Sequence, residues 1–340
     1  CFDGSRRALP WREDHPRNPY HVWVSEIMLQ QTRTETVKGY FQRWMEQFPT
    51  IRDLAQAPEE QVLRAWQGLG YYSRARNLHK AARQVMAEWG GQLPRERKAL
   101  GSLAGIGAYT VGAILSMAFG EKIPAVDGNL LRVLSRLYGV EEDISGTQGK
   151  KTITALAEEA IPGARPGDFN EALMDLGAEV CIPRHPRCEA CPLTAFCQAW
   201  KEGKTEILPV KKPKAPQKEL AAACGLVVRE GRYLFHKRPA KGMLASMWEF
   251  PMVLEPGAEK ARSSLVKLLE TEAGPAVWQH RHVFTHQIWN MTAYVMERAE
   301  VPGGEWSWFS PEEWEKVPLA GPHAKLADWL KKTVDRNEKV

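Results

Sequence analysis

The sequence predicts an all-α domain followed by an α+β domain. Apolar residues recur at helical spacing throughout residues 1–200. Residues 204–218 are rich in Pro and Lys, which is typical of a linker. Beyond them, short apolar runs and turn signals replace the helical periodicity. We therefore expect a helical domain over residues 1–203 and an α+β domain over residues 219–340.

The helical prediction depends on amphipathic spacing. Tyr20, Trp23, Val24, Ile27 and Met28 fall on one face of a single helix. Gly and Pro residues separate further segments with the same periodicity. These segments predict helices over residues 34–47, 59–67, 74–89, 108–118, 129–138, 151–160 and 169–180.

The second domain begins with a predicted hairpin. Leu220–Val228 is an apolar run, Glu230-Gly231 is a turn signal, and Arg232–Lys237 resumes an extended pattern. Another strand pair is expected within residues 278–297. Helical patterns fit residues 258–272 and 323–332.

Composition limits the class of protein. The chain has 340 residues, of which 44% are hydrophobic and 26% charged, as in globular proteins. No apolar run approaches the roughly 20 residues that cross a bilayer, so no membrane partner is expected. There is no signal peptide, and the first residue is Cys1 rather than Met, so we expect a trimmed start and a reducing cytoplasm.

The net charge of +5 is unevenly distributed. Residues 201–218 hold six Lys and two Glu, so most of the excess lies in one short segment. A denser basic cluster lies within residues 71–98, and two readings of it stay open: phosphate neutralisation or a solvated helix face. Its cations are Arg74, Arg76, Lys80, Arg83, Arg95, Arg97 and Lys98.

Four cysteines are spaced Cys181-x6-Cys188-x2-Cys191-x5-Cys197. Four thiolates this close together indicate one metal site, and the spacing suits an iron–sulfur cluster. Zinc is an alternative, although zinc sites usually show two CxxC pairs. Two disulfides are another, although they suit small secreted domains. Cys1 and Cys224 are expected to be free thiols. The spacing resembles the 4Fe–4S loop of the endonuclease III and MutY family of DNA glycosylases.

Leu103–Thr110 joins two predicted helices and contains Gly105 and Gly107. Glycines permit a tight turn, and the next helix begins with unpaired N–H groups that favour a phosphate. The segment resembles the helix-hairpin-helix motif of the same superfamily. A plain helix–helix turn is the alternative reading.

Two acidic residues are candidates for chemistry. Glu26 has the helical neighbours Val22, Trp23, Ile27 and Leu29, an apolar environment that would raise its pKa and hold a proton for donation. An exposed glutamate is the alternative. Asp127, in Val-Asp-Gly-Asn, would stabilise positive charge on a sugar, or merely cap the following helix.

With the motif Glu26-Ile-Met-Leu-Gln-Gln-Thr32, the chain resembles MutY adenine DNA glycosylases. The resemblance implies that Glu26 protonates adenine, that Asp127 stabilises the sugar cation, and that Tyr109 and Asn129 belong to the catalytic site. It implies that Gln31 and Thr32 contact the 8-oxoguanine side of the DNA and that Leu69 and Tyr71 press into the base stack. It further assigns Trp11 and Glu171 to the adenine pocket, and we expect Arg184, His185 and Arg187 of the cysteine loop to face phosphates.

Tyr109 distinguishes two related activities. Endonuclease III-type enzymes carry a lysine at this hairpin position, and its amine attacks the sugar as a Schiff-base nucleophile. A phenol cannot form an imine, so the resemblance implies hydrolysis without a strand-cutting step. A bifunctional endonuclease III-like enzyme for oxidised pyrimidines stays the first alternative, and a non-enzymatic, redox-sensing iron–sulfur DNA-binding protein the second.

The second domain resembles the Nudix (MutT-like) domain that MutY enzymes carry, through Trp248-Glu249-Phe250-Pro251. A Nudix hydrolase needs Arg-Glu-x-x-Glu-Glu-x-Gly, but this chain has Lys267-Leu-Leu-Glu-Thr-Glu-Ala-Gly274, too few acids for the usual magnesium site. We therefore expect a reader of 8-oxoguanine, not a pyrophosphatase. The family has Phe-Ser-His where this chain has Phe284-Thr285-His286, which keeps the hydroxyl. A strand end with a surface His is the alternative.

Taken together, the resemblance implies a monofunctional adenine DNA glycosylase of base excision repair. Its expected cofactor is a 4Fe–4S cluster, and its expected partner is double-stranded DNA containing A:8-oxoguanine or A:G mispairs. A monomer in the cytoplasm, at the bacterial nucleoid, is expected.

Overall fold

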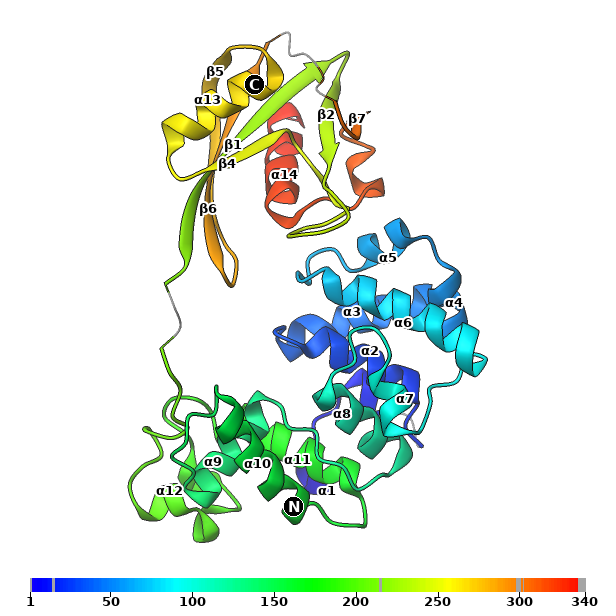
Figure 1. Ribbon diagram of the computed structural model, residues 1–340, viewed down its shortest axis with the longest axis vertical. Coiled ribbons are helices and arrows are strands. Elements are labelled where there is room, and N and C mark those ends of the chain that lie inside the picture. Colours follow the sequence, from blue (N-terminus) through cyan, green and yellow to red (C-terminus); the bar gives the residue numbers. More distant parts are fainter. Residues whose placement is uncertain (1, 14–15, 214–215, 298–300, 302, 336–340) are drawn as a thin grey trace. The chain divides into compact units, whose positions relative to one another are not determined.

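Helices form the chain as far as residue 201, and a mixed sheet with two longer helices follows (Figure 1). The computed structural model describes residues 2–13, 16–213, 216–297, 301 and 303–335. The chain divides into two compact units, residues 1–57 with 76–214 and residues 58–75 with 215–340. Cys1 lies outside the described residues. The predicted order of an all-α part and an α+β part is confirmed.

Every helix predicted in the first part is present. The longer helices are α2 (Pro19–Leu29), α3 (Thr34–Gln47), α5 (Glu59–Ala65), α6 (Ser73–Trp89), α8 (Ala108–Phe119), α9 (Gly128–Tyr138), α10 (Thr147–Ala160) and α11 (Pro166–Glu179). Short helices were not predicted, because fewer than two turns show no periodicity. They are α1 (Phe2–Ser5), α4 (Ile51–Gln56), α7 (Arg97–Gly101), α12 (Gln198–Lys201) and the 3-10 turns η1 (Pro10–Arg12), η2 (Cys188–Ala190) and η3 (Thr194–Phe196). No helix in the described part of the chain is long and apolar enough to cross a membrane.

Helices α2 and α8 pack against each other at the centre of the first unit. Both are buried on nearly all sides, so their sequences are apolar around the whole helix rather than along one stripe. Gly112 of α8 allows a close approach, since a Cβ there would lie 2.3 Å from the Pro124 carbonyl oxygen. This contact holds the segment that leads to Asp127 against α8.

Helices α9 and α11 form the second packed pair. Leu130, Val133 and Leu134 of α9 are buried with Leu173 of α11. At Gly177 a Cβ would lie 2.6 Å from the Cβ of Asn129, so only glycine permits this spacing. The pair fixes where α9 begins. The expected linker 204–218 is anchored at Leu208, which is buried.

The second unit contains a seven-stranded sheet in its described residues. Strands β3 (Trp248–Glu249), β2 (Arg232–Lys237), β1 (Lys218–Arg229), β6 (Gln287–Met296) and β5 (Ala273–Val283) follow in that order. Strands β4 (Met252–Glu255) and β7 (Trp306–Phe309) pair with β1 and β2. The β1–β6 pair is parallel, and the others are antiparallel.

Both faces of β1 are covered. Ala222, Cys224 and Leu226 share a core with Leu326 and Leu330 of α14 (Gly321–Asp335). The intervening residues Ala223 and Val227 pack instead with Leu265 and Leu269 of α13 (Ala258–Leu269). Burial on both faces explains why β1 reads as a continuous apolar run. The two helices lie on either side of β1 in Figure 1, and the 3-10 turn η4 (Trp314–Lys316) completes the unit.

Candidate active site and cysteine loop

Glu26 lies inside the packed α2–α8 pair. It is only 4% exposed, so the burial expected from its apolar neighbours is confirmed. The hydroxyl of Tyr109, in the first turn of α8, donates a hydrogen bond to Glu26 Oε2. The carboxyl group is therefore buried and hydrogen-bonded to one phenol.

This environment changes the acidity of Glu26. Burial raises its pKa to about 7, because desolvation penalises the carboxylate. The hydrogen bond from Tyr109 lowers the pKa of Glu26, and the positive charge of Arg12 lowers it further. The negative charges of Asp127 and Glu171 raise it. Burial also raises the pKa of Tyr109 well above its ordinary value, so the phenol stays a donor. A glutamic acid protonated near neutral pH is suited to general acid catalysis.

Asp127 is the N-cap of α9. Its Oδ1 accepts hydrogen bonds from the backbone N–H groups of Asn129 at 2.9 Å and Leu130 at 2.8 Å. Its Oδ2 accepts from Asn129 Nδ2 at 2.8 Å. Burial raises the pKa of Asp127, while these three donors favour the ionised form. The carboxylate is thus held in one orientation, and the expected capping is present alongside any chemical role.

A hydrogen-bonded chain runs from Asp127 to the cysteine loop. Asn129 Oδ1 accepts from Arg132 Nη2 at 2.9 Å, and Arg132 Nε donates to the Cys181 carbonyl at 2.6 Å. Arg132 Nη2 also donates to the Gly177 carbonyl at 2.6 Å. Only a side chain with both a donor and an acceptor fits between Asp127 and Arg132, which explains an asparagine at position 129.

Glu171 of α11 is buried with two arginines. Its Oε1 lies 3.1 Å from Arg12 Nε, and its Oε2 lies 2.8 Å from Arg17 Nη2. Arg12 also forms a 2.7 Å ion pair from Nη1 to Asp175 Oδ2. Trp11, which precedes Arg12, is buried as well. Of the two expected pocket residues, Glu171 is thus part of a charged network that sequence reasoning missed, and Trp11 adjoins it through its carbonyl, which accepts from Arg17 Nη1 at 3.3 Å.

The four cysteines of the loop line a common pocket together with Arg136. None of the described cysteines forms a disulfide. Arg136 Nη1 donates to Cys181 Sγ at 3.4 Å and to the Ile182 carbonyl at 2.7 Å, while its Nε donates to the Leu208 carbonyl at 2.9 Å. The neighbouring thiols add to burial in raising the pKa of Cys188. No group of three or more His, Cys, Asp or Glu in the described residues is arranged around a single metal ion.

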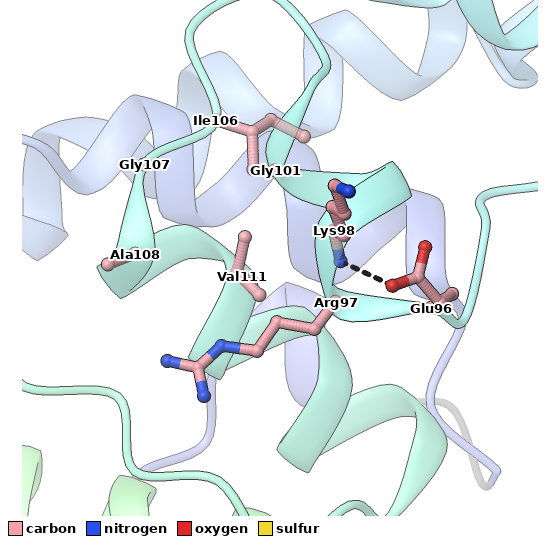
Figure 2. Close-up of a pocket in the computed structure, with 8 residues that line it drawn as sticks. All are labelled: Glu96, Arg97, Lys98, Gly101, Ile106, Gly107, Ala108 and Val111. Atoms are coloured by element: carbon pink, nitrogen blue, oxygen red, sulfur yellow. Dashed lines mark hydrogen bonds between the residues drawn. The ribbon is translucent and has the colours of Figure 1, made fainter.

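The hairpin between α7 and α8 has the expected geometry. Gly105 has a φ of +76°, and a Cβ there would lie 2.7 Å from the Asn77 side chain. Gly107 is the N-cap of α8, and no side chain caps the helix. The first N–H groups of α8 are therefore free to bind an anion. Figure 2 shows Gly107 and Ala108 at one end of an open groove beside this turn.

The remaining predicted DNA-contacting residues differ in exposure. Tyr71 is 42% exposed, whereas Leu69 is only 6% exposed. Gln31 is exposed with a φ of +59°, and Thr32 is half-buried. In the cysteine loop, Arg184, His185 and Arg187 are all exposed.

Phe284-Thr285-His286 forms the turn between β5 and β6. Phe284 N–H donates to the Gln287 carbonyl at 2.9 Å, and the Phe284 ring packs 4.7 Å from Trp289 between centroids. Thr285 and His286 are exposed at the tip. The degenerate Nudix segment continues from α13, but this helix ends at Leu269, so Glu272 lies outside it.

Comparisons with known proteins agree with this architecture. The model for the HhH-GPD superfamily base excision DNA repair proteins matches residues 24–162, and the NUDIX domain model matches residues 222–329. A thermostable thymine-DNA glycosylase shares 33% identity and a TM-score of 0.53, covering 59% of this chain and 92% of its own. A trapped endonuclease III–DNA covalent intermediate shares 25% identity and a TM-score of 0.51, covering 59% and 91%. Fold and site thus define a helical base excision repair protein joined to a Nudix domain.

The curated relatives are more specific. Human adenine DNA glycosylase is 38% identical over 345 residues, which cover 84% of this chain and 63% of the human protein. Mouse adenine DNA glycosylase is 36% identical over 375 residues, which cover 92% of this chain and 73% of the mouse protein. The chain belongs to the adenine DNA glycosylase family.

Proposed function

We propose that this chain removes adenine from double-stranded DNA in which it is paired with 8-oxoguanine or guanine. The observation that carries the proposal is the buried carboxyl group of Glu26, whose pKa is raised to about 7 by burial and by the charge of the oriented Asp127 carboxylate, among others. Adenine is a poor leaving group unless it is protonated, and an enzyme reaches it by flipping it out of the stack. Glu26 donates the proton to the base.

Asp127 acts on the sugar. Cleavage of an N-glycosidic bond develops positive charge on the sugar ring, and an oriented carboxylate stabilises that charge. The three hydrogen bonds that Asp127 accepts favour its ionised form and hold it in one orientation. Tyr109 keeps Glu26 in place, and Asn129 does the same for Asp127. A water molecule completes the hydrolysis.

Tyr109 supports a monofunctional enzyme. The hairpin offers a phenol where a glycosylase with strand-cutting activity needs an amine. Trapping with borohydride separates the two: no covalent protein–DNA adduct is expected, and a strong adduct would favour an endonuclease III-like enzyme.

We infer that the four cysteines hold a 4Fe–4S cluster. They surround one pocket without forming disulfides, and Arg136 supplies a positive charge beside them. Cys181, Cys188, Cys191 and Cys197 would be the ligands. The cluster would fold the loop that presents Arg184 and Arg187 to DNA phosphates. Purified protein is expected to contain about four iron and four sulfide per chain, and a single zinc instead would contradict the inference.

Contacts with the mispair follow the same proposal. Gln31 and Thr32 contact the 8-oxoguanine side of the duplex, and Leu69 and Tyr71 press into the base stack. Leu69 must turn outward to do so, because its side chain is buried here. Trp11 and Glu171 line the adenine pocket. Gly105 and Gly107 bind a phosphate through their turn, and Phe284, Thr285 and His286 read 8-oxoguanine.

A glycosylase assay on three duplexes tests this function. Base release is expected from A:8-oxoguanine and A:G duplexes by the monomeric chain, and not from thymine glycol:A. Activity on thymine glycol alone would support the bifunctional alternative. DNA binding without any base release would support the non-enzymatic one. Release of pyrophosphate from 8-oxo-dGTP would overturn the reader role of the Nudix domain.

A further inference from the structure

An open groove of about 650 Å³ lies beside the hairpin, between the start of α7 and the start of α8. Gly107 and Ala108 of α8 line one end, and Glu96, Arg97 and Lys98 line the other. Figure 2 shows Arg97 extending alongside Val111, on the side of the groove where α8 begins. The groove is therefore continuous with the turn assigned above to a DNA phosphate.

The two cations in this groove have no partner among the residues that the structure describes. Arg97 and Lys98 are exposed, and neither side chain forms a hydrogen bond or ion pair with any described residue. Lys204 is an exposed cation that is neutralised, since it pairs with Glu141 at 2.6 Å. The charges of Arg97 and Lys98 are thus available to an external anion.

The carboxylate of Glu96 does not pair with the two cations, because it accepts hydrogen bonds from the backbone. Glu96 caps α7, since its Oε1 accepts from the Lys98 backbone N–H at 3.0 Å (Figure 2). Its Oε2 accepts from the Ala99 N–H at 2.9 Å. Both carboxylate oxygens face backbone donors rather than the cationic side chains. The groove therefore carries a net positive charge, and the uncapped N–H groups of α8 add to it.

Helix stability does not explain the two cations. Arg97 and Lys98 are the first two residues of α7. The first turn of a helix favours acidic side chains and disfavours basic ones. A sequence that breaks a local rule without a local gain often does so at a functional surface.

We propose that Arg97 and Lys98 bind the phosphates of the DNA strand next to the one held by the hairpin, so that the groove extends the backbone contact of the enzyme. The site takes a phosphodiester, not a base, because it offers charge and N–H donors but no aromatic side chain on which a base could stack. It positions the duplex and carries no sequence information. The proposal rests on the proposed function only in taking DNA as the ligand.

The test is the salt dependence of DNA binding, measured by fluorescence anisotropy with the full chain. Each phosphate contact contributes about −0.9 to the slope of log affinity against log salt. The Arg97→Gln, Lys98→Gln double variant is expected to lose about 2 from the magnitude of this slope. Near 0.1 M salt, each single substitution should weaken binding about fivefold to tenfold. The loss should be equal for an undamaged duplex and for one with an A:8-oxoguanine pair.

A matched control removes two other exposed, adjacent cations, Lys150 and Lys151 of α10. Their change to Gln should leave the slope nearly unchanged. An unchanged slope in the groove variant, or an equal loss in the control, overturns the proposal. Thermal unfolding of the groove variant should match or exceed that of the parent, because the substitutions remove cations from a first helical turn. A fall in melting temperature would instead assign the two residues a structural role.

The rate of adenine release shows whether the groove contributes to DNA binding alone or also to bond cleavage. With enzyme in excess at saturating concentration, the groove variant should release adenine at the parent rate. If the parent releases no adenine, the proposed function fails, yet the slopes still decide whether the groove binds phosphate.

Discussion

The hydroxyl of Tyr109 donates a hydrogen bond to Glu26, a residue 83 positions earlier in the chain. The bond joins the first turn of α8 to the buried face of α2. It opposes the rise in pKa that burial imposes on Glu26, so the acid stays near pH 7 instead of higher. One contact therefore holds the proposed acid and lowers the proton affinity that burial gives it.

The pH dependence of base release follows from that pKa. Glu26 acts when protonated, and its protonated fraction falls as pH rises through about 7. The single-turnover rate constant on an A:8-oxoguanine duplex should therefore be highest near pH 6 and fall about tenfold per pH unit above 8. Glu26→Gln cannot donate the proton and should lose release by at least a thousandfold, about 4 kcal/mol, while its DNA affinity stays within threefold. A rate that rises with pH would contradict the assignment.

The Tyr109→Phe variant tests how Tyr109 affects the orientation and the pKa of Glu26. The substitution removes the donor that lowers the pKa of Glu26, so that pKa should rise. The falling limb of the pH–rate profile should move to higher pH by about one unit. The plateau rate should drop as well, because the carboxyl group is less well oriented. A profile that moves to lower pH would show that the bond has another role.

Two substitutions at Asp127 distinguish its role as the N-cap of α9 from its role as a negative charge. Asp127→Asn keeps an oxygen for the N–H groups of Asn129 and Leu130, so stability should change little. Asp127→Ala removes the cap and should cost about 1 kcal/mol of unfolding free energy. Both should abolish base release, because neither carries a charge. Residual activity in Asp127→Asn, measured with excess enzyme, would indicate that capping is the main role of the residue.

Arg132 connects Asn129 to Cys181 and is nearly buried. Arg132→Gln should lose these charged hydrogen bonds and destabilise the protein by about 3 kcal/mol, seen as a lower melting temperature. It should also slow base release at least tenfold, since Asn129 no longer fixes Asp127. Arg83→Gln is the control, because Arg83 donates to the Ala55 carbonyl on the surface. Equal effects of the two variants would argue against a specific link.

Thr285 tests the reading turn. Thr285→Ala should reduce the preference for A:8-oxoguanine over A:G by about fivefold, the loss of one hydrogen bond of about 1 kcal/mol. Thr285→Ser retains the hydroxyl and should keep the preference. Relative rates on the two duplexes measure the effect. An unchanged ratio in the alanine variant would remove Thr285 from recognition.

Much of the fold was predictable because its signals are local. Amphipathic spacing located the longer helices, and the apolar neighbours of Glu26 predicted its burial correctly. The sequence missed α7, which is too short to show periodicity, and β7, a strand of four residues. It also missed Arg132, since an arginine within a helix looks the same in sequence whether it is exposed or buried.

Local sequence alone determined the helical and mixed parts, the close spacing of the four cysteines that line one pocket, and the tight turn at Gly105. These features depend on residues within a few turns of one another. Only the tertiary structure placed Tyr109 on Glu26 and Arg132 between Asn129 and Cys181. The physical reason is that proton affinity and side-chain orientation depend on burial and on partners far along the chain, which appear only when helices pack.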